Sequence, residues 1–253
     1  MLPLFLLASA LVFAVGEEVD QHIVNGEIAT PHDYPWQLSL QRNGGHICGA
    51  VLISNRFAIT AAHCVSQSYL TQYRIQCGAH NIQVPESTRQ GVSLERITIH
   101  PQYNPNGQRP AFPNDIAVLK LASNVILTNE CQVANLASGS NTFGGQAGMI
   151  TGWGRLSGNC HRVGKTLSRL KEGAITVLTT SSCSSIWGST VSSSFHVCIL
   201  DQSSSPSYGA CNVGNTVVGL ASFVASGCLI NYPSVYVRVS NYYSWIWNTV
   251  NSM

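Results

Sequence analysis

His63, a quarter of the way along the chain, lies in a sequence typical of a histidine that acts as a general base. His63 lies in the run Thr-Ala-Ala-His-Cys, which follows an apolar segment and surrounds the ring with small residues and a cysteine. Histidine changes charge near neutral pH and acts as a general base where its ring is held still. His63 is therefore a candidate catalytic base. The alternative is a structural histidine, which is common in such a position.

A carboxylate stands at the head of an otherwise apolar run. Asp115 precedes Ile-Ala-Val-Leu, so burial of this strand start would cost free energy unless the carboxylate is hydrogen-bonded. A histidine would supply that bond. In acyl transfer, the carboxylate fixes the imidazole tautomer and stabilises the imidazolium that forms. The alternative is an aspartate that caps a turn before the strand.

The elements that must position these two groups have the pattern of β-barrels. Short β-rich runs alternate with clusters of Gly, Pro, Asn and Ser, which predicts an all-β fold with a sizeable core in a chain of 253 residues that is 45% hydrophobic. The serine-rich stretches 181–194 and 203–207 are interpreted as loops, and an amphipathic stretch at 242–250 predicts a terminal helix. The expected strands are Trp36–Leu40, Val51–Ile53, Asp115–Leu119 and Val217–Leu220.

The N-terminus predicts secretion. Residues 1–16 are an apolar run that ends in Ala14 and Gly16, as in a secretory signal peptide, and residues 17–22 form a short polar propeptide. No comparable run follows, whereas a membrane-spanning helix needs about 20 apolar residues. Only 9% of residues are charged and the formal net charge is +2, which argues against a nucleic-acid partner. We expect an extracellular monomer without a membrane partner.

The cysteines predict disulfides. A secreted chain with nine cysteines and no Cys-x-x-Cys pair favours disulfides over metal binding, and the odd count leaves at least one thiol unpaired within the chain. We expect no metal and no cofactor.

From residue 23 onward, the sequence resembles the trypsin, chymotrypsin and elastase family of serine endopeptidases. This resemblance implies one peptidase domain over residues 23–253, with two antiparallel six-stranded β-barrels, an active-site cleft between them and a C-terminal helix. It assigns His63 and Asp115 as catalytic residues of the first barrel and Ile23 as the N-terminus created by activation. The matching segments are Ile23–Gly26, Tyr34–Gln41, Cys48–Ala50, Leu52–Ser54, Thr60–Cys64, Asp115–Leu121, Thr151–Gly154 and Pro233–Val239.

The same resemblance implies disulfide pairings and substrate contacts. It pairs Cys48 with Cys64, Cys183 with Cys198 and Cys211 with Cys228, and it leaves the pairing of Cys77, Cys131 and Cys160 open. The substrate-binding residues that it implies are Gly209 at the base of a pocket, and Ser222, Phe223 and Val224 on the strand that pairs with substrate. Since this set carries no carboxylate, we expect a preference for apolar side chains.

The family's nucleophile segment, Gly-Asp-Ser-Gly-Gly-Pro, does not occur in this sequence. In a first alignment, which we favour, residues 209–212 precede the missing segment and Val213 follows it, as if about nine residues had been excised. In a second alignment, Cys211 trails the segment and Ser205 replaces the nucleophile. The second requires Pro206 and Tyr208 in a turn that normally uses glycine at positive φ.

The sequence therefore predicts a secreted serine-endopeptidase homologue that is catalytically impaired or inactive, with a cleft for peptide or protein substrates and inhibitors. Two alternatives remain. The chain is an active chymotrypsin- or elastase-like endopeptidase that uses a loop serine such as Ser205, or it is a variant of such an enzyme from which a short in-frame segment has been lost between Asn212 and Val213.

Overall fold

The structure is a computed structural model that describes residues 27–154, 167–201, 209–225 and 232–253. The predicted signal peptide and propeptide, Ile23, Ser205, Cys160 and Cys228 lie outside the described residues. Within these ranges, no helix is both long enough and apolar enough to span a bilayer.

The described residues form fourteen strands, two α-helices and three short 3₁₀ helices. The strands are β1 (Glu27–Ile28), β2 (Gln37–Arg42), β3 (Gly45–Leu52), β4 (Phe57–Thr60), β5 (Tyr73–Cys77), β6 (Gln90–Ile99), β7 (Ala117–Leu121), β8 (Asn135–Leu136), β9 (Ala147–Gly152), β10 (Lys171–Val177), β11 (His196–Asp201), β12 (Ala210–Val213), β13 (Thr216–Phe223) and β14 (Ser234–Arg238). The helices are η1 (Ala62–Cys64), η2 (Gln67–Gln72), α1 (Thr180–Trp187), η3 (Gly188–Thr190) and α2 (Val239–Asn251).

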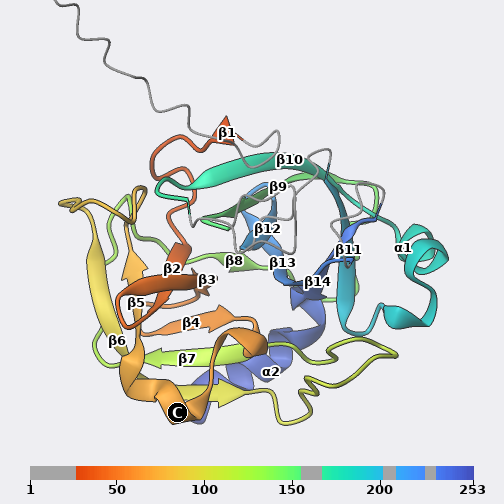
Figure 1. Ribbon diagram of the computed structural model, residues 1–253, viewed down its shortest axis with the longest axis horizontal. Helices are drawn as coiled ribbons and strands as arrows, with labels where there is room; N and C mark the ends of the chain where they lie inside the picture. Colours follow the sequence, from red (N-terminus) through yellow and green to blue (C-terminus); the bar gives the residue numbers. More distant parts are fainter. Residues whose placement is uncertain (1–26, 155–166, 202–208, 226–231) are drawn as a thin grey trace, which may run out of the picture.

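The first half of the chain closes into a barrel with the strand order β2-β3-β4-β7-β6-β5. In Figure 1 it occupies the lower left of the molecule. Apolar side chains such as Leu38, Leu40, Ile75 and Leu119 fill its interior and are fully buried. Closure leaves none of these six strands with an unpaired edge, so the barrel is a rigid support for the loops at its rim.

The second half forms another closed barrel, in which β9, β10, β11, β14, β13 and β12 pair in a ring, each antiparallel to its neighbours. The two-residue strand β1 adds to β10, and β8 pairs in parallel with β13. Two closed six-stranded barrels and the C-terminal helix α2 confirm the predicted fold class (Figure 1). The predicted strands are found in β2, β3, β7 and β13.

The interpretation of 181–194 as loop is wrong for its first part, since Thr180–Trp187 is the helix α1. Serine has a modest intrinsic helix propensity, but here the helix start is capped, because the Thr179 hydroxyl accepts a hydrogen bond from the backbone N–H of Ser182. Tertiary contacts fix the remainder. Cys183 is disulfide-bonded to Cys198, and the Trp187 indole donates to the carbonyl of Pro233.

Three disulfides connect described residues. Cys48–Cys64 and Cys183–Cys198 agree with the pairings implied by the resemblance, and Cys77–Cys131 answers part of what the sequence left open. The implied Cys211–Cys228 disulfide is wrong, because Cys211 is a free thiol. Cys211 lies in β12 among the apolar residues of the second barrel with no exposed surface, and this burial raises the pKa of the thiol.

A buried polar network joins the two barrels beside this strand. The Asn212 side chain accepts a hydrogen bond from the Trp36 indole N–H and donates to the Thr151 hydroxyl, which in turn donates to the Gln37 side chain. Asn212, Thr151 and Gln37 are each at most 2% exposed. Since buried polar groups need their partners, this network fixes the register between the barrels.

We predict that Asn212→Leu lowers the free energy of unfolding by about 2 kcal/mol or more, because the Trp36 N–H and the Thr151 hydroxyl lose a buried partner. Urea unfolding monitored by tryptophan fluorescence measures the change. The matched control is Asn124→Leu at an exposed loop position, which should change stability by less than about 0.5 kcal/mol. Equal effects of the two substitutions would contradict a role for the network.

Candidate active site

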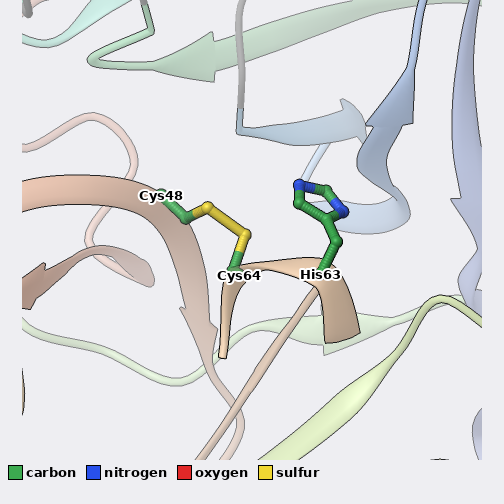
Figure 2. Close-up of side chains that lie close together, drawn as sticks. All are labelled: Cys48, His63 and Cys64. Carbon is green, nitrogen blue, oxygen red and sulfur yellow. A yellow bond between two sulfur atoms is a disulfide. The ribbon is translucent and has the colours of Figure 1, made fainter. Parts of the chain in front are cut away.

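His63 is held by the segment that follows β4. The chain turns through η1 immediately after Ala61, and the next residue, Cys64, is disulfide-bonded to Cys48 on β3. Figure 2 shows the His63 ring standing clear of η1 beside this disulfide. The covalent link and the tight turn restrict the backbone on both sides of the histidine, as a positioned base requires.

Asp115 is held by the residue before it. Asn114 adopts a left-handed conformation, with φ of 60°, which asparagine tolerates better than most residues. Its side chain donates to the carbonyl of Gln102 and accepts from the hydroxyl of Tyr242 on α2. The C-terminal helix therefore fixes the turn that delivers Asp115 to the head of β7.

The two predicted catalytic residues meet. Asp115 Oδ2 lies 2.8 Å from His63 Nδ1, Asp115 Oδ1 accepts from the His63 backbone N–H at 2.9 Å, and the Ser222 hydroxyl donates to Oδ2 at 2.6 Å. The Asp115 side chain is 1% exposed, whereas that of His63 is 34% exposed. A buried carboxylate thus holds Nδ1 of the imidazole and leaves Nε2 available.

Ser222 contributes more than the sequence predicted. It was expected to contact substrate, and the structure also makes it a second polar link between the barrels, since it lies on β13 and its hydroxyl donates to the carboxylate at the head of β7. Burial alone would lower the pKa of His63, but the hydrogen bond and negative charge of Asp115 outweigh burial and raise this pKa above its ordinary value.

A cleft of about 680 Å³ opens beside His63. Ser222, Phe223 and Val224 all line it, as the resemblance implies. The described residues that line it bear no carboxylate, ammonium or guanidinium group, and the titratable side chains among them are the imidazoles of His46 and His63. The remaining lining residues are His46, Ile47, Cys48, Phe112, Trp153 and Gly154.

Gly209 lies elsewhere. It lines a separate small cavity of about 20 Å³ together with His63, Cys64 and Ala221. Its backbone is pressed against the second barrel, because a Cβ atom at this position would lie 1.7 Å from the carbonyl oxygen of Thr151. Gly209, the first described residue of its segment, therefore lies next to His63 and not at the base of the cleft as the resemblance implied.

This position bears on the two alignments. The first alignment places residues 209–212 ahead of the nucleophile, which does not fit the position of Gly209 beside His63. It also places Cys211 in a disulfide, whereas Cys211 is free. The second alignment places the nucleophile shortly before Cys211 and fits both findings. The Asn212–Val213 bond lies within β12, which continues through a turn at Gly214 into β13.

His46 is a site residue that sequence reasoning missed. Its Nδ1 lies 2.8 Å from the buried hydroxyl of Ser39, and its ring packs edge-on against Trp153. Burial lowers the pKa of His46 to about 4, so this second imidazole of the cleft is neutral near pH 7. Local sequence gave no signal for it, because a β-bulge at Ile47 interrupts the alternation of β3, and His46, Ile47 and Cys48 all line the cleft.

An aromatic cluster forms one wall of the cleft. The ring of Phe223 contacts those of Phe112, Trp187 and His196, each at a centroid distance of 5.5 Å. His196 is 4% exposed, and burial lowers its pKa to about 4. Rings packed in this way make the wall apolar and stiff, which favours apolar ligand groups over charged ones.

A family model described as Trypsin matches residues 23–246. The chain belongs to the trypsin family. It is 37% identical over 247 residues to a chymotrypsin-like serine proteinase from Haliotis rufescens, with 90% of this chain and 92% of the relative covered. It is 34% identical to fibrinolytic enzyme isozyme C from Lumbricus rubellus, with 88% and 98% covered, and 36% identical to chymotrypsin-like elastase family member 1 from Bos taurus, with 93% and 92% covered.

This trypsin-family chain therefore has the fold of the family, a cleft beside one barrel's histidine and aspartate, and homologues that are serine endopeptidases. Peptides and proteins are the substrate class of such a family. The serines at 203, 204, 205 and 207 lie outside the described residues. The described part of the catalytic site is therefore the base His63 and its carboxylate Asp115.

We predict that Asp115→Asn lowers the pKa of His63 to below about 6.5, its ordinary value, because the amide removes the charge that raises this pKa and leaves the burial that lowers it. A titration of the His63 ring by NMR measures the change. Ser222→Ala is the matched control, since it retains the Asp115 charge and should leave the pKa raised. An unchanged pKa in Asp115→Asn would contradict the assignment.

Proposed function

We propose that this trypsin-family chain is a secreted peptide-binding protein whose cleft accepts apolar side chains and whose endopeptidase activity is strongly impaired. The observation that carries the proposal is the absence of Gly-Asp-Ser-Gly-Gly-Pro from a sequence that keeps His63 and Asp115. The base and its orienting carboxylate are two of the parts that acyl transfer needs. They do not by themselves supply a nucleophile or the N–H groups that stabilise an oxyanion.

The rate losses measured when such groups are removed from comparable enzymes favour strong impairment of the endopeptidase activity. Loss of the nucleophile costs about 10⁶ in turnover in a comparable triad enzyme, and loss of one oxyanion donor costs about 10² to 10³. Under the second alignment, Pro206 takes one glycine position of the segment and Tyr208 takes the position of its proline. Proline has no backbone N–H, and the tight turn loses the glycine that favours it.

Activation by insertion of a new N-terminus is impaired as well. The missing segment contains the aspartate that receives the ammonium group of the residue corresponding to Ile23. Burial of that ammonium without a carboxylate costs several kcal/mol. His22 also precedes Ile23 in place of the Arg or Lys that a tryptic activator recognises. We therefore propose that Ile23 does not insert.

Secretion is supported by the apolar run at residues 1–16 and by the three disulfides among the described residues. Disulfides form and persist in oxidising compartments such as the extracellular space. The preference for apolar ligands is supported by the uncharged cleft wall formed by Phe112, Phe223 and Val224. The names of the relatives, a chymotrypsin-like proteinase and an elastase, agree with this specificity.

A second candidate function is that of an active endopeptidase with a replaced nucleophile. It is favoured by the intact geometry of His63, Asp115 and Ser222, and by the position of Gly209 beside His63. The segment that joins Gly209 contains Ser205 and Ser207, either of which has the hydroxyl group that acyl transfer needs. One labelling experiment separates the two candidates.

We predict that a fluorophosphonate probe labels less than 1 in about 10³ molecules of the secreted protein after N-terminal trimming at Ile23, since the sequence lacks the segment that presents an activated serine to the base. Intact-mass spectrometry measures the labelled fraction, with an active family member as the positive control. Stoichiometric labelling would establish the active enzyme instead, provided that Ser205→Ala or Ser207→Ala abolishes it. In that case His63→Ala should also abolish the labelling, because the serine needs its base, and Ser203→Ala should retain it.

A further inference from the structure

Three side chains that bind soft metals converge at the edge of the cleft. One ligand atom each of Cys48, His63 and Cys64 lies within 4.8 Å of the other two. Figure 2 shows the two sulfur atoms and the imidazole ring side by side. The residues come from two segments, β3 and η1, whose relative position the closed first barrel fixes. The sulfur atoms are joined in a disulfide, which is a poor metal ligand.

We propose that reduction of the Cys48–Cys64 disulfide converts this cluster into a zinc site that incorporates His63. A dithiol reductant supplies two electrons and two protons, becomes a disulfide itself and leaves two protein thiols. Zinc then displaces the proton of each thiol, so that two thiolates and one neutral imidazole coordinate the ion; two protons are released, and a third from each molecule in which His63 was protonated. The proposal does not depend on whether the protein hydrolyses peptides.

The reductant reaches this disulfide before the other described ones. Cys48 lines both the cleft and the small cavity beside His63, and Cys48 and Cys64 are both partly exposed. By contrast, the cysteines of the other two described disulfides are at most 6% exposed: Cys77, Cys131, Cys183 and Cys198. Thiol–disulfide exchange requires access of the attacking thiolate to a sulfur atom, so selective reduction follows from the exposure.

The donor set and its geometry suit zinc. Thiolate and imidazole are the usual zinc ligands, at about 2.3 Å and 2.0 Å, so tetrahedral ligands lie about 3.5 to 3.8 Å apart. Ligand atoms already within 4.8 Å need only small side-chain rotations to reach those separations. Cys48 and His63 line the cleft, so water from the cleft would supply the fourth ligand.

Asp115 prepares the imidazole for this role. Its carboxylate holds Nδ1 of His63 at 2.8 Å, which fixes the tautomer and leaves Nε2 as the ligand atom. A carboxylate behind a metal-bound histidine is the usual arrangement in zinc proteins and strengthens binding. Bound zinc would occupy the nitrogen that serves as the base, so reduction and metal binding would together remove that base.

The experiment compares oxidised and selectively reduced protein. The secreted protein is reduced briefly with a small dithiol, desalted without oxygen and alkylated in one portion, so that mass spectrometry shows that Cys48 and Cys64 are the thiols formed. The remainder is titrated with Zn²⁺ and, as a spectroscopic probe, with Co²⁺. We expect one equivalent of zinc bound only after reduction, with thiolate-to-cobalt charge-transfer absorption.

Variants assign the ligands. His63→Ala should weaken zinc binding at least tenfold, and Asp115→Asn should weaken it less. The matched control is Cys211→Ser, which removes a buried free thiol outside the cluster and should leave the affinity unchanged. Equal affinity in His63→Ala, equal binding by the oxidised protein, or loss of the near-ultraviolet circular dichroism of the folded protein on reduction would each overturn the proposal.

Discussion

The site depends on one buried charge. The Asp115 carboxylate is almost fully buried and accepts hydrogen bonds from three donors: the backbone N–H of His63, the Nδ1–H of His63 and the hydroxyl of Ser222. A buried carboxylate that loses a partner is strongly destabilising. The donors come from both barrels, so the same interaction that orients the imidazole also holds the two halves of the fold in register.

The opposite side of the site is constrained by backbone contact rather than by charge. Gly209 packs so closely on Thr151 that any side chain there would collide with a backbone carbonyl, and β12 follows at once in a barrel that pairs on both sides. This contact ties the start of β12 to β9 next to His63. The catalytic plan of the family is thus retained in its scaffold and its base, while the segment that carries nucleophile and oxyanion donors has a different sequence.

The sequence predicted the features that follow from local pattern. Short β-rich runs between clusters of Gly, Pro, Asn and Ser predicted the strands, the family resemblance implied two barrels, and Asp115 was expected to pair with His63 because a carboxylate at the head of an apolar strand needs a donor. It could not predict Cys77–Cys131, because pairing depends on which loops the barrel brings together. The Cys211–Cys228 pairing was implied by the family resemblance alone, whereas Cys211 is a free thiol.

Other misses have the same origin in tertiary structure. The helix α1 forms in a serine-rich stretch because a cap and a disulfide outweigh weak propensity, which no local pattern indicates. His46 and Phe112 join the cleft only when β3 and the loop before β7 are placed beside β13. An isolated histidine or phenylalanine carries no signal of this kind in the sequence.

We propose that the assembled base and carboxylate lack a nucleophile to activate. The most direct test is the pre-steady-state hydrolysis of a nitrophenyl ester of an apolar acyl group by the trimmed protein and by His63→Ala. We expect no burst of nitrophenolate, and hydrolysis rates of the two proteins that agree within about twofold. A burst equal to the protein concentration, absent from His63→Ala, would contradict this proposal.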